Sequence, residues 1–355
     1  MTCTIDFTVC VRCFTFNHAP YISETMDGFC MQQTTFPFVC VIVDDASTDG
    51  EGEVINSYIR NHFDLDNKLM VRKKETDDFS MIFAQHQTNK NCFFAVYFLK
   101  YNHYSKPLIK DRKFQYINEF YGKVRYRALC EGDDYWIVSN KLQRQVDYLD
   151  AHNDCSLVFH NAFKEDASTG KRQGAHRIQK ESGDIRINKI FRDGGLIPTL
   201  SIVYRAETFL EFDKFPSNCP VGDLRIQSYA ALKGKVHYIN EIMGVYRLVQ
   251  TSVTHQLAGD VNKYVDHHKH FIDWYHSVDE YTNRKYTKEI KQAIAFSEAR
   301  ITIACRNYKP LWNPKYYVYI FSKPYNTMIG LLLRMVGMES VYSYIHNKLE
   351  KKRNQ

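Results

Sequence analysis

Apolar runs alternate with helix-like segments along the first part of the chain. The stretch FTVCVRCF at 7–14 is rich in β-branched and aromatic residues, and PFVCVIVDDAS, which begins at Pro37, contains an almost continuous apolar run. Such a run is typical of a parallel strand that is covered on both faces. Helical patterns follow at 24–33 and 53–62, and KLMVRKK at 68–74 predicts a third strand. This alternation predicts an α/β fold with an open, mainly parallel sheet flanked by helices.

Acidic residues stand where the second predicted strand ends. Asp44 and Asp45 close the strand, and Thr48 is predicted to cap the next helix, with Glu51 at the spacing of a capping box. In open α/β sheets, ligands bind beyond the carboxyl ends of the strands. The two aspartates are therefore candidates for ligand contact, although Asp45 also suits a structural role in the turn that follows.

A second acidic group lies in the stretch YRALCEGDDYWIVSNK at 126–141. An apolar, strand-like run leads into Glu131, Asp133 and Asp134, which surround Gly132. Carboxylates this close repel one another, so a bound cation is expected there. Because the group also follows a strand, it is predicted to converge with the first acidic pair. The alternative is that these acids only cap the helix that follows.

Composition narrows the class of protein and of partner. The chain has 355 residues, of which 44% are hydrophobic and 25% charged, as in an ordinary globular protein. Its ten cysteines are scattered without zinc-like spacing, and Asp6 and Arg12 interrupt the N-terminal apolar stretch, so we expect free thiols, no signal peptide and a cytoplasmic location. The net charge of +7 is dispersed and accompanies no nucleic-acid-binding motif, so nucleic acid is not an expected partner.

Four motifs in order resemble the family 2 glycosyltransferases, which have the Rossmann-like GT-A fold and use nucleotide sugars. The motifs are FTFNHAPYI after the first strand, VDDASTDG after the second, CEGDDYW before the helix KLQRQVDYL, and VGDLRIQSYAALKGKVHYINEIMGVYR. The resemblance covers about residues 7–255. It implies a GT-A catalytic domain at 1–255, followed by a helical C-terminal extension at 256–355.

The resemblance assigns the acidic group to a divalent cation, Mn²⁺ or Mg²⁺. A departing nucleoside diphosphate needs its charge neutralised, and a hard cation held by one or two carboxylates suits that task. The sequence EGD looks like the acidic metal-binding element of the family with glutamate in its first position. Asp133 is therefore the predicted main metal ligand and Glu131 the second, while Asp134 is predicted to contact the nucleotide sugar.

Further site residues follow from the same resemblance. The loop after the first strand and the first acidic pair are implied to hold the nucleotide through Thr15, Asn17, Tyr21, Asp44 and Asp45.

Two late residues complete the predicted site. Asp223 precedes a helical pattern that ends at Gly234, and the resemblance makes it the base that takes the proton of the acceptor hydroxyl. A simple helix cap is the alternative for Asp223. Arg247, in GVYR, is expected near the diphosphate because arginine suits bidentate phosphate contacts, with a surface arginine as the alternative. His255 follows in a loose pattern that favours an ordinary loop residue.

The chain also departs from the family pattern. Residues 79–101 read as an insert, for which a buried extra element and a lid stay open as alternatives. Helical patterns occupy 264–275 and 288–306. The tail from Tyr316 ends in KLEKKRNQ and suits an amphipathic segment that docks on an anionic membrane. The alternative is a helix packed on the catalytic domain or on a partner subunit.

The sequence therefore predicts an inverting, metal-dependent glycosyltransferase, hexosyltransferase in type. Its donor would be a nucleotide sugar, a UDP-sugar in our expectation. Its acceptor would be a saccharide or a lipid-linked saccharide in bacterial surface-polysaccharide biosynthesis, reached from the cytoplasm at the inner face of the cell membrane. A nucleotidyltransferase is one alternative, although TFNHAPYI is not a glycine-rich phosphate loop. A non-catalytic nucleotide-sugar-binding module is the other.

Overall fold

The computed structural model describes residues 5–106, 108–109, 111–176, 178–192, 195–249, 259–323 and 325–338. The chain forms two compact units. The first unit comprises 1–186, 195–212 and 226–250, and the second comprises 187–194, 213–225 and 251–355. The predicted boundary near residue 255 stays a prediction. Residues 187–194 and 213–225, from the middle of the chain, group with the helical unit. A single boundary along the sequence therefore does not separate the two units.

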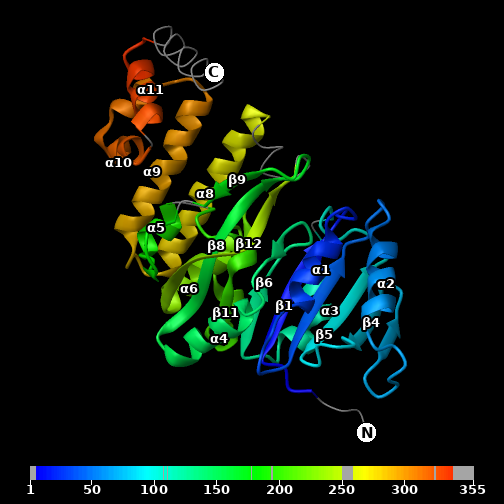
Figure 1. Ribbon diagram of the computed structural model, residues 1–355. Helices are drawn as coiled ribbons and strands as arrows, with labels where there is room; N and C mark the ends of the chain where they lie inside the picture. Colours follow the sequence, from blue (N-terminus) through cyan, green and yellow to red (C-terminus); the bar gives the residue numbers. More distant parts are fainter. Residues whose placement is uncertain are drawn as a thin grey trace. The chain divides into compact units, whose positions relative to one another are not determined.

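The first unit is built on a mixed sheet with a parallel centre (Figure 1). Four neighbouring strands are parallel, in the order β6 (Tyr126–Leu129), β1 (Val9–Thr15), β2 (Phe38–Asp44) and β5 (Cys92–Leu99). Thr15 is in register with Asp44, and Arg12 is in register with Leu129. The carboxyl ends of β1, β2 and β6 therefore open at the same edge of the sheet.

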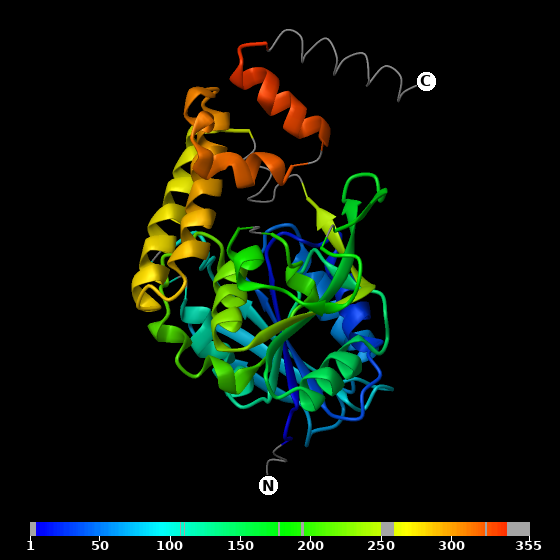
Figure 2. The same cartoon turned by 90° about the vertical axis from the view of Figure 1, so that its left-hand side faces the viewer.

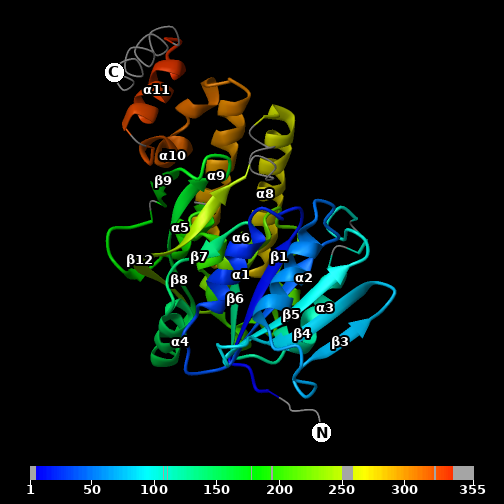
Figure 3. The same cartoon turned by 45° about the vertical axis from the view of Figure 1, so that its right-hand side comes forward.

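Helices cover both faces of these strands, and the alternation of side chains explains the two layers. Val9, Val11 and Cys13 of β1 belong to a core with apolar residues of α1 (Ile22–Cys30), α2 (Glu51–His62) and α4 (Lys141–Ala151). Cys10, between them, belongs to the opposite core with α3 (Arg112–Tyr121). Figure 3 shows α1 and α2 together on one face of the sheet. The predicted α/β fold with flanking helices is confirmed.

The sheet continues beyond β6 with one short strand and two long ones. β11 (Val203–Arg205) pairs antiparallel with both β6 and β8 (Cys155–Asp166), and β12 (Lys235–Leu248) runs parallel to β8. Shorter elements complete the first unit: β7 (Tyr135–Trp136), β9 (Arg172–Ala175), β10 (Gly183–Asp184), η1 (Thr199–Ser201), η2 (Ala206–Phe209) and part of α6 (Gly222–Lys233).

Two local predictions are wrong. The third parallel strand is β5, which lies inside the presumed insert at 79–101 and is followed along the sheet by antiparallel β4 (Phe79–Gln85). The stretch predicted as the third strand does contain the third strand of the chain, β3 (Arg72–Glu75), but this is an exposed antiparallel edge strand. Thr48 does not cap α2. The cap position is Gly50, whose φ of 90° places it in the left-handed region that suits glycine.

The second unit is helical. α8 (Val261–Tyr281) and α9 (Thr287–Ala304) pack side by side (Figure 2) and confirm the two predicted helices. Its other elements are α5 (Ile187–Arg192), η3 (Phe212–Lys214), η4 (Lys309–Trp312), η5 (Pro314–Tyr316), α10 (Tyr317–Phe321) and α11 (Tyr325–Met335). No helix among the described residues is long and apolar enough to cross a membrane. His255 and the terminal KLEKKRNQ lie outside the described residues.

Candidate active site

The loops that carry the predicted donor-site residues meet at the carboxyl edge of the parallel strands. The Asp45 amide donates to the Thr15 carbonyl at 3.0 Å, and the Gly132 amide donates to the Phe14 carbonyl at 3.0 Å. These bonds join the loops after β2 and β6 to the end of β1. The predicted convergence of the two acidic groups is therefore present, while the roles of their members stay predictions.

Gly132 allows this close approach. A β-carbon at this position would lie 2.1 Å from Thr15 Oγ1 and 2.5 Å from Thr15 Cβ. Real β-carbons do not approach other atoms so closely, and both atoms belong to the side chain of Thr15, at the end of β1. The bare backbone of Gly132 thus lets the acidic loop lie directly against β1.

The Gly132→Ala variant is expected to lose both stability and activity. The added methyl group must push the acidic loop away from β1, which costs about 1–3 kcal/mol of unfolding free energy, and misplaced carboxylates lower turnover by about 10²-fold. Urea unfolding and donor cleavage would measure the two effects. Gly170→Ala is the control. Its φ of +66° adds backbone strain, but no atom lies within 4 Å of its added methyl group, so it introduces no steric clash. A Gly132→Ala variant that is no worse than this control would contradict the packing argument.

Glu51 is a central residue that sequence reasoning assigned only to a capping box. It is fully buried. Its Oε2 accepts hydrogen bonds from the His18 amide at 2.9 Å and from Ser47 Oγ at 2.8 Å, and its Oε1 accepts one from Thr15 Oγ1. One carboxylate therefore ties the loop after β1 to the start of α2. The only signal in the sequence was an acid in the first turn of a helix beside two polar loops.

Asn17 connects the same two loops from the other side. Its φ of 57° is left-handed, a conformation that asparagine tolerates better than most residues. Its amide donates to Ser47 Oγ at 2.9 Å, and its side-chain oxygen accepts from the Thr48 amide at 2.8 Å. In this structure Asn17 joins the loop after β1 to the loop after β2. Its contact with the nucleotide stays a prediction.

The aspartates at the end of β2 are both buried but differ in their partners. Asp45 accepts from the amides of His103 at 2.6 Å and Tyr104 at 3.0 Å, and it forms an ion pair with Lys113 at 3.2 Å. Asp45 thus organises the polar loop that follows β5. Asp44 accepts from the Ser47 amide at 2.9 Å, and burial raises the pKa of its carboxyl group. Asp44 has fewer protein partners and is the better placed of the two for a ligand.

The three acids after β6 differ in exposure. Asp134 is 2% exposed and accepts from the Arg247 amide at 2.9 Å. Burial, and then the charge of Asp133, raise the pKa of Asp134 well above its usual value. The side chains of Asp133 and Glu131 are 20% and 33% exposed, and Asp133 Oδ2 lies 3.9 Å from His18 Nε2. Asp133 and Glu131 are therefore the members that a ligand can reach.

Arg247, near the end of β12, supports the acidic loop after β6. Its guanidinium is buried, donates to the Asp133 carbonyl at 2.9 Å, pairs with Glu24, and lies 3.5 Å from Glu165. The Tyr135 ring centroid lies 4.3 Å from the guanidinium and the Tyr21 ring centroid 5.1 Å from it. The alternative of a surface arginine is therefore wrong. The predicted contact with a diphosphate would require one of these ion pairs to open.

The candidate base lies in the other unit. Asp223 is in the first turn of α6, within the segment 213–225 that groups with the helices. It is half-buried, and its carboxylate accepts from the Leu224 amide at 2.6 Å. Because α6 begins at Gly222, Asp223 lies inside the helix rather than at its cap position. Its role as a base stays a prediction.

A divalent cation fits the exposed acids. Within the described part of the chain, no group of three or more His, Cys, Asp or Glu side chains forms a complete metal cage. A cation that bridges a donor diphosphate needs no such cage, because phosphate oxygens and water supply the remaining ligands. Asp133 and Glu131 offer hard oxygen donors from one loop, which is the set that Mg²⁺ or Mn²⁺ prefers.

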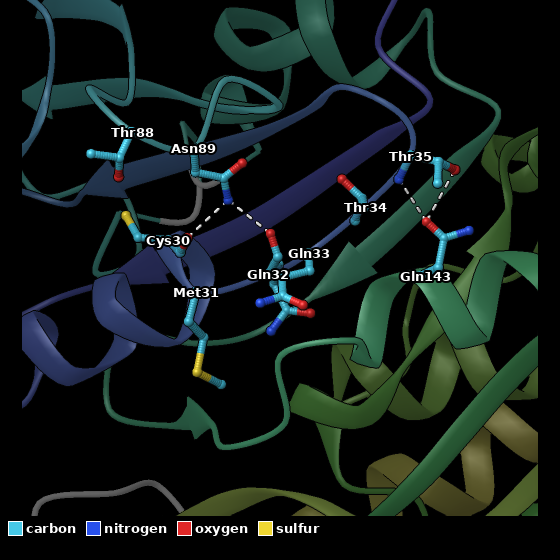
Figure 4. A pocket seen from close by; sticks show the side chains of 9 residues that line it. All are labelled: Cys30, Met31, Gln32, Gln33, Thr34, Thr35, Thr88, Asn89 and Gln143. Atoms are coloured by element: carbon cyan, nitrogen blue, oxygen red, sulfur yellow. Dashed lines mark hydrogen bonds between the residues drawn. The ribbon is translucent and has the colours of Figure 1, made fainter.

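A separate pocket lies at the opposite edge of the sheet (Figure 4). It has a volume of about 580 Å³ and is lined by residues before β2 and β5, among them Cys30, Thr34 and Asn89, and by Gln143 of α4. Asn89 Nδ2 donates to the carbonyls of Cys30 at 2.9 Å and Gln32 at 2.7 Å. None of its lining residues is charged, so it offers no carboxylate to a cation and no basic side chain to a diphosphate.

Comparison with known proteins supports the class of fold. No family model matches the chain. An uncharacterized protein of Mycobacterium bovis and two of Mycobacterium tuberculosis strains are each 28% identical over 251 residues, which is 70% of this chain and 61% of theirs. The chain thus spans about three fifths of the length of the curated relatives it matches.

The structural match covers nearly the whole chain. S. aureus TarS 1–349 in complex with UDP-GlcNAc has a TM-score of 0.56 at 12% identity, covering 96% of this chain and 92% of that one. The same protein in complex with UDP has a TM-score of 0.53 at 13% identity, with the same coverage. At these identities the similarity shows the fold alone, and the fold is GT-A-like.

Proposed function

We propose that this protein is an inverting, metal-dependent glycosyltransferase. It transfers a sugar from a nucleotide-sugar donor, a UDP-sugar in our proposal, to a saccharide or lipid-linked saccharide in bacterial surface-polysaccharide biosynthesis. The observation that carries the proposal is the convergence of Asp44, Asp133 and Glu131 at the carboxyl edge of a GT-A-like sheet. The complexes of TarS with UDP and with UDP-GlcNAc support the choice of donor class.

Each group of site residues has its own role in the proposed transfer reaction. Asp133 and Glu131 would hold the divalent cation, which would supply positive charge to a departing diphosphate. Asp44 and Asp45, with Thr15, Asn17 and Tyr21, form the walls of the nucleotide site, and Asp134 and Arg247 keep the acidic loop in place beside the donor. Asp223 takes the proton of the acceptor hydroxyl as its oxygen bonds to the anomeric carbon and the bond from that carbon to the diphosphate breaks.

The expected location is the cytoplasm, at the inner face of the cell membrane. All nine cysteines in the described part of the chain are free thiols, which suits a reducing compartment. A lipid-linked acceptor would bring the enzyme to a membrane surface.

The test is release of nucleoside diphosphate from a panel of nucleotide sugars with Mn²⁺ or Mg²⁺. We expect slow cleavage of one nucleotide class that chelation of the metal abolishes. A nucleotidyltransferase would release pyrophosphate instead, and a binding module would show a saturable rise in melting temperature without cleavage. Asp223→Ala should retain the rise in melting temperature with the donor. If no nucleotide raises the melting temperature with metal present, the proposal fails.

A further inference from the structure

The last described segment of the second unit contains basic residues but no acidic ones, although Lys315 pairs with Glu298 just before it at 2.8 Å. Between 299 and 338 the sequence contains no aspartate or glutamate, and its basic residues are Arg300, Arg306, Lys309, Lys315, Lys323 and Arg334. In the whole chain, by contrast, 40 acidic residues nearly balance 47 basic ones. A segment of this kind is complementary to an anionic partner.

Large apolar side chains of the same segment are exposed. Between 38% and 63% of the surface is exposed for each of Trp312, Tyr317, Val318, Phe321 and Val336. These five residues are called the aromatic surface below. They are not needed for the core of this segment, because α10 turns other residues, Tyr319 and Ile320, inward against Leu311 and Leu331.

The members of the aromatic surface are contiguous. The Tyr317 hydroxyl donates to the Trp312 carbonyl at 3.3 Å, and the rings of Tyr317 and Phe321 lie 6.1 Å apart. Trp312 Nε1 donates to the Met335 carbonyl at 3.3 Å, beside Val336. A patch of connected, exposed aromatic residues is unusual on a surface that faces only water.

We propose that the aromatic surface docks peripherally on an anionic lipid bilayer. Tryptophan, tyrosine and phenylalanine favour the interface between headgroups and acyl chains, and exposed basic residues nearby, Arg306 and Lys309, meet the anionic headgroups. A second copy of the chain fits less well, since pairing this surface with itself would oppose two basic segments. This inference rests on the proposed membrane location. It adds that the aromatic surface makes the contact and that the lipid is anionic.

The native tryptophans provide a direct test. Trp312 is exposed, whereas Trp136 and Trp274 are buried, so a change in fluorescence on vesicle addition reports on the aromatic surface. With phosphatidylcholine vesicles that contain phosphatidylglycerol, we expect a blue shift, quenching by brominated lipid, and co-sedimentation about tenfold tighter than with phosphatidylcholine alone. Trp312→Phe should remove the blue shift while keeping the co-sedimentation.

Two variants and a control separate the contributions. Phe321→Glu should abolish vesicle binding, and Arg306→Gln with Lys309→Gln should remove the preference for anionic lipid. Leu210→Glu, at a site in the first unit that is 82% exposed, should bind like the wild type. Circular dichroism and melting temperature establish that each variant is folded.

The outcomes distinguish this inference from the proposed function. Absence of binding to anionic vesicles, or equal binding to both vesicle types, would overturn the docking surface. A dimer in sedimentation velocity that Phe321→Glu dissociates would also overturn it. Donor cleavage, measured on the same samples without vesicles, tests the enzyme independently, so membrane docking can fail while the transferase proposal stands.

Discussion

Asp133→Ala is expected to lower nucleotide-sugar cleavage by about 10³-fold without lowering the melting temperature. The loss of activity follows because the variant removes one of the two reachable carboxylates that would hold the cation beside the diphosphate, and such charge stabilisation contributes about 4 kcal/mol. Stability should be kept because Asp133 lies beside the buried carboxyl group of Asp134, whose pKa its charge helps to raise. Removing Asp133 therefore relieves repulsion within the acidic loop.

This combination separates a ligand-binding acid from a structural one. A structural acid in this loop would lower the melting temperature when it is removed. The measurements are donor cleavage over a range of Mn²⁺ concentrations and thermal unfolding without metal. Asp66→Ala, at an exposed position after α2, serves as the control. Cleavage within about threefold of the wild-type rate would exclude Asp133 as the main metal ligand.

The convergence of the site residues could be predicted because it depends on a simple rule. Residues that follow parallel strands meet at one edge of the sheet, so the acids after two apolar runs had to lie near one another. The register of Thr15 with Asp44 and the bond from Gly132 to Phe14 show that convergence. The roles of the individual acids require a ligand and do not follow from the rule.

The presumed insert shows what local patterns leave out. The run Cys92–Leu99 is as apolar as the run in β2, and the structure places it beside β2 as the next parallel strand. The chain reaches β5 through an antiparallel hairpin partner, β4, rather than directly from a helix. Pairing order depends on contacts between distant strands, so neither run alone reveals which one neighbours β2.

The supporting contacts of Arg247 and Glu51 could not be predicted for a related reason. The partner Glu24 is 223 residues away from Arg247, and Thr15 is 36 residues away from Glu51. A buried charged residue is stable only when such partners satisfy it, and no local pattern indicates them. The sequence predicted a diphosphate contact for Arg247 and a capping box for Glu51, whereas their contacts as supports of the loops around the site appear only in the fold.

Lys141 is buried with less compensation than these residues. It is the first residue of α4 and is fully buried, and its amine has no hydrogen-bond partner. Burial lowers its pKa to about 7. The neighbouring thiols of Cys130 and Cys40 have raised pKa values and stay neutral, so they provide no anion, and His160 has a lowered pKa and stays neutral as well. The Trp136 ring, 3.8 Å from the amine, partly compensates for the buried charge.

Lys141→Met is therefore expected to stabilise the protein most at neutral pH. The unfolded lysine titrates near 10.5 and the folded one near 7, so the folded state binds fewer protons between these values. The cost of burying the charge is complete below pH 7 and disappears as the pH rises toward 10.5. The stability advantage of the methionine variant should thus shrink by about 3 kcal/mol between pH 7 and 9.5 in urea unfolding. Other titrating groups are common to both proteins and cancel in this difference. Lys68→Met, at an exposed position, should show no such change. If the Lys141→Met variant and the wild type keep a constant difference across this range, the buried amine is charged in the folded protein, and its contact with Trp136 outweighs the cost of burial.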